Sequence, residues 1–363
     1  DVADLIFIDP VGTGFSRAKS DDSGKPFWSI EGDANAAFSL IKTWVKGHNR
    51  QTSPLFVAGE SYGGFRLAAM STALTGLNTK GLIFISPLLS PTITGEAAGN
   101  DLPYIFNFPT MALAASYHGR GEHAGAQATE VWDAARQFAQ GPYAQALQEG
   151  SLLQAEEKTA VAKQISAWLG VTPDLVLEHD LRIKSQAFLE TLLADDNMLL
   201  GRLDTRVKAE KKPPANPDRP AAANDPSLGL GRSNVIVSSE IGNYLREQVG
   251  VNTPRDYNSL TLDVNFKWNW DYGSGYGKYF LNMAPRVADA LRTAPDMDLL
   301  VLGGLYDLAT PVLGARYVIS HAGIPADRMH LTYLPAGHSP FDTDENRAAF
   351  TGAISDFVQR QMR

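Results

Sequence analysis

The sequence places a serine at the centre of a glycine-rich turn. Ser61 is the middle residue of 59–63, Gly-Glu-Ser-Tyr-Gly, which fits the pattern G-x-S-x-G. An apolar run, 55–58, precedes this turn, and a helix-forming segment, 65–74, follows it. A strand that turns directly into a helix holds its apex residue in a strained conformation, and small neighbours let the two elements approach. We therefore expect the Ser61 hydroxyl to project as a nucleophile.

A serine hydroxyl needs a neighbouring base, and histidine is the side chain suited to accept its proton near neutral pH. Of seven histidines, His338 lies in the loop Pro-Ala-Gly-His-Ser-Pro, after a predicted strand and before the last predicted helix, 346–361. His330 begins that strand and is interpreted as structural. The other five lie in polar stretches or at a helix end. His338 is therefore the predicted base.

The imidazole in turn needs an acid that fixes its tautomer and stabilises its charged form. In an α/β-hydrolase this acid lies between the serine and the histidine in chain order. Asp307 follows the apolar run 299–302 and stands one strand-helix unit before His338. Asp296 and Asp298 precede the same run, at the opposite end of the predicted sheet. Asp307 is the predicted orienting acid.

Several elements must position these loops. Short apolar runs predict strands buried on both faces of a parallel sheet. These runs are 5–8, 55–58, 82–85, 299–302 and 330–334. Residues 33–46 have helical spacing between the first two runs, as in a βαβ unit. Residues 103–197 are periodic and helix-forming, and 211–233 contains five prolines, which predicts an exposed loop.

The predicted fold class is α/β, with a mostly parallel sheet flanked by helices and an inserted helical cap, as in an α/β-hydrolase. Residues 1–100 form the first part of the core, 101–260 the cap, and 261–363 the second part of the core. The chain has 363 residues, of which 44% are hydrophobic and 20% charged, a globular composition.

Other classes of function are disfavoured. The net charge of -8 and the lack of a basic run exclude nucleic-acid binding, and the longest apolar stretches are too short for a membrane span. The sequence has no cysteine, and His118 and His123 lack the spacing of a metal site, so no metal or cofactor is expected. The glycines at 12–14 and 273–278 do not complete a nucleotide-binding pattern.

Four segments resemble the serine carboxypeptidase family: 7–16 (FIDPVGTGFS), 59–64 (GESYGG), 304–307 (GLYD) and 336–338 (AGH). The similarity is greatest to the bacterial branch, through 117–119 (YHG), 201–206 (GRLDTR) and 225–227 (DPS). This resemblance implies hydrolysis of the last peptide bond of a substrate with a free C-terminus, through an acyl-enzyme and best at acidic pH. A periplasmic or secreted location is expected.

The resemblance also implies roles for individual residues. Ser61 is the nucleophile, His338 the general base and acid, and Asp307 the orienting carboxylate. The backbone N–H of Tyr62 is an oxyanion donor, and Glu60 helps to hold the substrate carboxylate. Two carboxyl groups bind each other only if they share a proton, which favours low pH. Alternatively, Glu60 is a strand-end residue bonded to backbone.

Two departures from the family stand out. The family has an Asn-Gly-Gly-Pro-Gly loop upstream of the segment 7–16, which supplies the second oxyanion donor, and nothing in the chain matches it. Loss of such a donor costs on the order of a hundredfold in rate. We expect that the front of the protein is missing and that these residues alone are weakly active or inactive. The second departure is Ser339, where the family often has Met, so the leaving-residue pocket is expected to differ.

Other interpretations stay open. An esterase or acyltransferase would use the same three residues, and a catalytically silent binding domain is a third reading. Trp268 and Trp270 either line a substrate cleft or pack one face of a strand. The preferred C-terminal residue and the oligomeric state are not encoded in any pattern we can read.

Overall fold

The computed structural model describes residues 3–273 and 279–363, and its centre is a parallel sheet. Four strands lie in the order β1-β2-β7-β8 and run in the same direction. They are β1 (Leu55–Glu60), β2 (Thr79–Ile85), β7 (Asp298–Gly304) and β8 (Met329–Leu334). Four of the five predicted strands are therefore confirmed. Because the strands are parallel, the loops after β1, β7 and β8 meet at one edge of the sheet.

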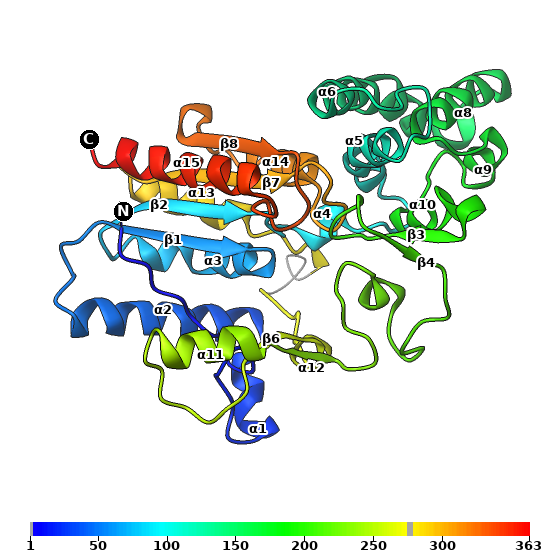
Figure 1. Cartoon of the computed structure of the whole chain (residues 1–363). Coiled ribbons are helices and arrows are strands. Elements are labelled where there is room, and N and C mark those ends of the chain that lie inside the picture. The colour runs from blue at the N-terminus through cyan, green and yellow to red at the C-terminus, as the bar shows by residue number, and fades with distance from the viewer. Residues whose placement is uncertain (1–2, 274–278) are drawn as a thin grey trace.

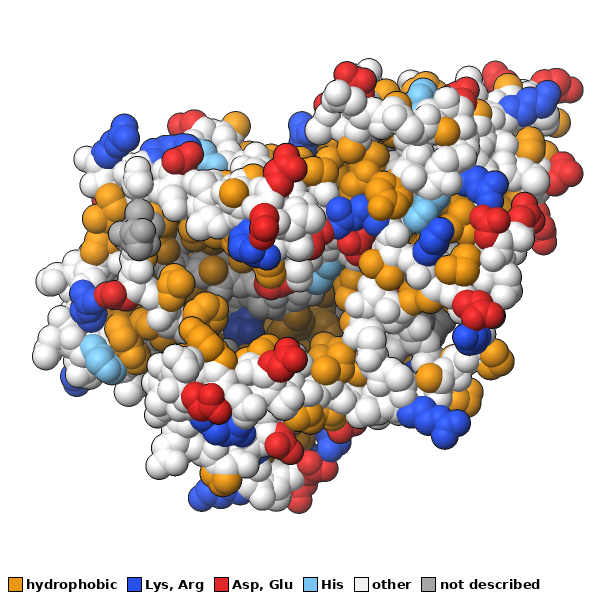
Figure 2. Space-filling model, in the orientation of Figure 1, with side chains coloured by type: hydrophobic (Ala, Val, Ile, Leu, Met, Phe, Trp, Pro, Cys, Tyr) orange, Lys and Arg blue, Asp and Glu red, His pale blue; other side chains and the backbone are white. Residues whose placement is uncertain are grey.

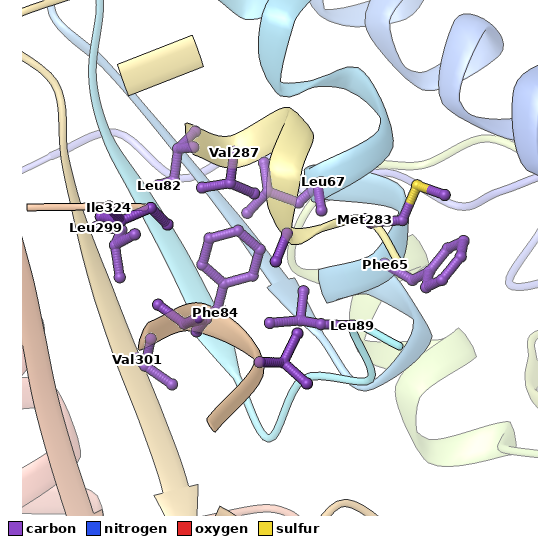
Figure 3. Close-up of a cluster of buried hydrophobic side chains, with 14 of the residues drawn as sticks. Phe65, Leu67, Leu82, Phe84, Leu89, Met283, Val287, Leu299, Val301 and Ile324 are labelled. Atoms are coloured by element: carbon purple, nitrogen blue, oxygen red, sulfur yellow. The ribbon is translucent and has the colours of Figure 1, made fainter. Parts of the chain in front are cut away.

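Helices cover both faces of this sheet (Figure 1). One face packs against α2 (Ile30–Gly47), α3 (Tyr62–Leu74), α13 (Ala284–Thr293) and α14 (Val312–Ser320). Figure 3 shows this core, in which Phe65 of α3 and Phe84 of β2 are completely buried. The other face packs against α15 (Asp344–Gln361), whose Phe357 contacts the strands. This arrangement is the predicted α/β fold.

Polar side chains fix the starts of the two longest helices. The Ser29 hydroxyl accepts a hydrogen bond from Gly32 N at 3.1 Å at the start of α2. The Thr343 hydroxyl accepts one from Asn346 N at 3.1 Å at the start of α15. Each satisfies a backbone N–H that has no partner within its helix.

The strand predicted at 5–8 is wrong. These residues form no strand, and Leu5, Ile6 and Phe7 are 77%, 49% and 88% exposed. An apolar run forms a strand only where a neighbouring strand satisfies its backbone groups, and β1 is an edge strand within the described residues. The βαβ unit that was expected to begin at 5–8 is therefore absent, whereas β1, α3 and β2 form a parallel crossover.

A helical lobe lies beyond the arrowheads of the sheet strands (Figure 1). Its helices are α5 (Leu102–Tyr117), α6 (Ala128–Phe138), α7 (Ala144–Glu149), α8 (Ala155–Leu169), α9 (Pro173–Glu178) and α10 (Ser185–Thr191). They enclose a hydrophobic core of their own, in which Phe108 and Phe188 are buried. The helical character predicted for 103–197 is confirmed. Leu308, the residue after Asp307, belongs to this second core.

Smaller elements complete the chain. They are α1 (Asp21–Gly24), α4 (Pro91–Thr94), α11 (Ser239–Glu247), α12 (Leu262–Phe266), the antiparallel pair β3 (Met198–Leu200) and β4 (Lys208–Glu210), and the antiparallel pair β5 (Val235–Val237) and β6 (Asn258–Thr261). No helix within 3–273 and 279–363 combines the length and the apolar character needed to cross a membrane.

The proline-rich stretch 211–233 has little regular structure, as predicted, but it is not uniformly exposed. Arg219 and Asp225 are buried within it. Arg219 Nη2 donates hydrogen bonds to the carbonyl oxygens of Gly231 and Ser233 at 3.0 and 2.7 Å. Buried polar groups of this kind order a loop that lacks helices and strands, so the expectation of an exposed loop is partly wrong.

Candidate active site

Ser61 occupies the sharp turn between β1 and α3. Its φ of 55° and ψ of -119° lie in a region that residues other than glycine rarely adopt. Its N–H donates to Ile85 O at 2.9 Å, and its carbonyl oxygen accepts from Leu88 N at 3.1 Å. A Cβ added at Gly59 would overlap the carbonyl oxygen of Gly63. The missing side chain therefore lets the strand and the helix approach closely around Ser61.

Asp307 and His338 lie together after β7 and β8. His338 Nδ1 is 2.8 Å from Asp307 Oδ2, and Asp307 is completely buried. Thr310 Oγ1 donates to the same oxygen at 2.6 Å, while the backbone N–H groups of Ala309 and Thr310 donate to Oδ1 at 2.8 and 3.1 Å. With a proton on Nδ1 shared with Asp307, the neutral imidazole presents Nε2 as an acceptor.

Charges around His338 favour its protonated form. Burial lowers the pKa of His338, but the charge and hydrogen bond of Asp307 and the charge of Glu60 raise it more. The charge of Arg202, which lies in the loop between β3 and β4, lowers the His338 pKa. The net result is a His338 pKa above its ordinary value.

A hydrogen bond joins the serine turn to the histidine loop. Ser339 Oγ donates to Glu60 Oε1 at 2.9 Å. Glu60 directly precedes Ser61, and Ser339 directly follows His338, so this contact joins the two loops that carry the predicted reactive residues. The partner of Glu60 is thus a side-chain hydroxyl, and it is supplied by the position at which the resemblance showed a departure.

Tyr62 begins α3, where the first N–H groups of a helix have no partner within it. Its ring stacks on Phe65 at 5.4 Å between centroids and meets Trp268 and Trp270 edge-on at 4.8 and 5.7 Å. Both tryptophans follow α12 and flank Asn269, which forms an isolated parallel β-bridge with Ser29, so the strand interpretation of this pair holds only for a single bridge. Burial, as the larger cause, raises the Tyr62 pKa and keeps its phenol neutral.

Two groups of residues near the site were not identified from the sequence. Thr310, which supports the Asp307 carboxylate, follows it by three residues, a spacing typical of capped turns. Arg66 Nε pairs with Asp33 Oδ2 at 2.6 Å, and its guanidinium lies 5.7 Å from the centre of the Tyr62 ring. The signal for this contact is the spacing of four residues between Tyr62 and Arg66 on one helix.

The surface is hollowed near the middle of the molecule. Figure 2, in the orientation of Figure 1, shows a central depression between the region of the sheet above and the region of α11 below, with apolar and charged side chains on its walls. In the part of the chain that the structure describes, no three His, Asp or Glu side chains gather in a way that would hold a metal ion. Most of the glycine run 273–278 lies outside the described residues.

Comparisons with known proteins agree with this architecture. The sequence model of the serine carboxypeptidase family matches residues 1–104. A search of curated proteins finds no significant match. Among solved structures, a prohormone-processing carboxypeptidase of Saccharomyces cerevisiae, Kex1Δp, is similar with a TM-score of 0.52 and 14% identity, over 96% of this chain and 73% of that one.

A monoacylglycerol lipase of Paleococcus ferrophilus matches with a TM-score of 0.33 and 12% identity, over 90% of this chain and 76% of that one. At 14% identity the likeness to the yeast carboxypeptidase shows a shared fold. The serine carboxypeptidase model therefore covers the first 104 residues, which include the Ser61 turn, and the structural likeness extends the shared α/β fold to nearly the whole chain.

Proposed function

We propose that the protein is a serine carboxypeptidase that uses Ser61, His338 and Asp307 as a catalytic triad. The observation that carries this proposal is the Glu60–Ser339 hydrogen bond, which joins the strained Ser61 turn to the loop of a histidine already bonded to a buried aspartate. The periplasmic or secreted location implied by the resemblance belongs to the same proposal.

In the proposed reaction, Ser61 Oγ attacks the carbonyl carbon of the last peptide bond while His338 Nε2 accepts its proton. Asp307 stabilises the imidazolium, and the Tyr62 N–H donates to the oxyanion. His338 then protonates the leaving amine, which departs as a free amino acid. A water molecule attacks the acyl-enzyme in the same way, with His338 again as base, and releases Ser61.

Glu60 would select substrates with a free C-terminus. A peptide carboxylate next to the Glu60 carboxylate is repelled unless the two groups share a proton. Of the two carboxylate oxygens of Glu60, Oε1 accepts a hydrogen bond from the described residues and Oε2 does not, so Oε2 is available for this contact. An esterase or acyltransferase with the same triad would not need Glu60.

The test combines covalent labelling with product analysis. The protein is treated with a fluorophosphonate probe, and the modified residue is located by mass spectrometry. We expect modification at Ser61, slow release of free amino acids from peptides with a C-terminal carboxylate, and still slower release from the same peptides as C-terminal amides. Ser61→Ala should lose labelling and at least about 10³-fold in turnover.

Ser151→Ala, at an exposed position of the helical lobe, is the matched control and should behave as the unmodified protein. Equal cleavage of acids and amides would favour the esterase or acyltransferase reading. A folded protein in which Ser61 is not labelled would contradict the triad and favour a binding domain.

A further inference from the structure

Three segments that the triad itself does not use converge behind it. Residues 117–118 end helix α5, residues 201–206 form the loop between β3 and β4, and residues 225–227 lie in the proline-rich stretch. They are far apart in the sequence, yet contacts join them to one another and to the Asp307 and His338 loops. We call these three segments the cradle.

The cradle holds the histidine loop through its backbone. His338 N donates to Leu203 O at 2.7 Å. At the preceding position, a Cβ added to Gly337 would lie 2.6 Å from the Asp204 Cβ, so the histidine loop and the 201–206 loop are in contact there. The position of the imidazole along its loop is thus fixed from the cradle.

The same six-residue loop also holds the aspartate. Leu308 N donates to Arg202 O at 3.0 Å. On the other side of Asp307, the Tyr306 carbonyl oxygen accepts from Thr205 N at 3.0 Å and from Thr205 Oγ1 at 3.1 Å. Both neighbours of Asp307 are therefore bonded to the loop that bonds His338.

Arg206 connects these contacts through its side chain. Its Nε and Nη2 donate to the two carboxylate oxygens of Asp204 at 2.9 and 2.7 Å, and its Nη1 donates to Pro335 O at 3.0 Å. It also pairs with Asp342, and its guanidinium lies 5.0 Å from the centre of the Tyr306 ring. One planar cation thus reaches the loops of both His338 and Asp307.

The remaining cradle segments fix the loop from behind. Asp225 Oδ2 accepts from Arg202 N at 2.6 Å, and His118 Nε2 donates to Thr205 O at 2.7 Å. Asp225 is buried, so its bonds are protected from water. These contacts tie the loop to helix α5 and therefore to the helical lobe.

We propose that Arg206 is a positioning residue, which holds the Asp307 and His338 loops at one fixed separation and couples their alignment to the helical lobe. The proposal rests on the triad proposed above. Arginine is suited to this task because its rigid fork donates in several directions at once, whereas lysine presents a single point charge.

The test compares Arg206→Met and Arg206→Lys by their rate of labelling with the fluorophosphonate probe and by their turnover of a small chromogenic ester. A small misalignment of reacting groups costs on the order of 10²-fold in rate. We expect Arg206→Met to lower kcat by about 10- to 100-fold, with KM changed less than about threefold, and Arg206→Lys to recover only part of the rate.

A third readout separates positioning from mere stability. The proton on His338 Nδ1, bonded to Asp307, gives a downfield NMR resonance, which should move or broaden in Arg206→Met. Asp342→Asn, which removes one partner and keeps the Asp204 pair, should give a smaller loss of the same kind even if Arg206→Met folds poorly.

Arg136→Met is the matched control. Arg136 pairs with Asp133 and lies over the Trp132 ring on helix α6, away from the cradle. It should leave labelling, kcat and the resonance unchanged. If Ser61 of the unmodified protein is not labelled, the triad itself fails. If it is labelled, and the folded Arg206 and Asp342 variants react at the same rate with the same resonance, the positioning role is overturned.

Discussion

At the scale of single residues, His338 and Glu60 place opposite demands on pH. In the proposed reaction His338 must be neutral to accept the Ser61 proton, and its raised pKa moves this requirement towards higher pH. Binding of a peptide carboxylate by Glu60 requires a shared proton, which favours lower pH. Cleavage of a neutral ester requires only that His338 is neutral, whereas cleavage of a peptide also requires the shared proton at Glu60. The two substrates should therefore have different pH profiles.

Glu60→Gln tests this separation. The Glu60 charge raises the His338 pKa, so its removal should lower that pKa and move the acidic limb of kcat/KM for a neutral ester to lower pH. Peptide cleavage should lose its preference for low pH, because the glutamine amide donates a hydrogen bond to the substrate carboxylate without a shared proton. Stopped assays across the pH range measure both effects. Unchanged peptide cleavage with an unchanged pH profile would contradict the role of Glu60.

Arg202→Met should move the same ester limb in the opposite direction, to higher pH, because the Arg202 charge lowers the His338 pKa. Glu157→Gln, at an exposed position on α8, is the neutral comparison and should leave both profiles in place. A shift of the same sign in the Glu60 and Arg202 variants would rule out a direct effect of charge.

The site residues that could be predicted from the sequence are those that lie in a short local motif. Ser61, Asp307 and His338 each follow a strand within a short motif, so their neighbourhood could be predicted. Arg206 and Arg66 could not, because an ion pair depends on which segments meet in space. In the sequence, such an arginine cannot be told from a solvent-exposed one until the segment that carries its acidic partner is placed in space.

At the scale of elements, the approach of β1 to α3 decides whether Ser61 keeps its strained turn. Gly59→Ala should lower the free energy of unfolding by about 1–3 kcal/mol, because its methyl group meets backbone atoms of Gly63 and Gly64 that have no room to move. Labelling of Ser61 should slow in parallel. Urea unfolding and the probe assay measure the two effects.

Gly63→Ala is the matched substitution on the other side of the turn. A Cβ there would meet only a flexible arginine atom at 3.9 Å, and alanine is the better helix former. The free energy of unfolding should therefore stay equal or rise by up to about 1 kcal/mol. Equal destabilisation by the two alanines would show that close packing at Gly59 is not the cause.

Element types were predictable wherever burial and periodicity agreed. The runs at 55–58, 82–85, 299–302 and 330–334 became strands because each has a neighbour in register. The run at 5–8 has the same composition and no such neighbour among the described residues. Hydrophobicity reports what a segment would gain by burial, and it carries no information about the presence of the surface that would bury it.

At the scale of the whole molecule, Leu5, Ile6 and Phe7 form a contiguous exposed apolar segment, which favours association between copies. Phe7→Glu should shift the sedimentation profile towards monomer and raise the concentration at which the protein precipitates. Leu152 is 77% exposed but isolated on the helical lobe, so Leu152→Glu should change neither property. Equal behaviour of both variants and the unmodified protein would show that this segment does not drive association.

The contacts between the cradle and the two loops of the proposed triad also have a consequence for folding. Ser61 belongs to an early part of the chain, the cradle to the middle, and Asp307 and His338 to the last strands. Each bond between Leu203 and His338, or between Arg202 and Leu308, must close a loop of more than a hundred residues, which slows folding relative to local contacts. During synthesis the serine turn therefore emerges long before the segment that carries its proposed base. In the proposed triad, Ser61 stays unactivated until these long-range contacts close.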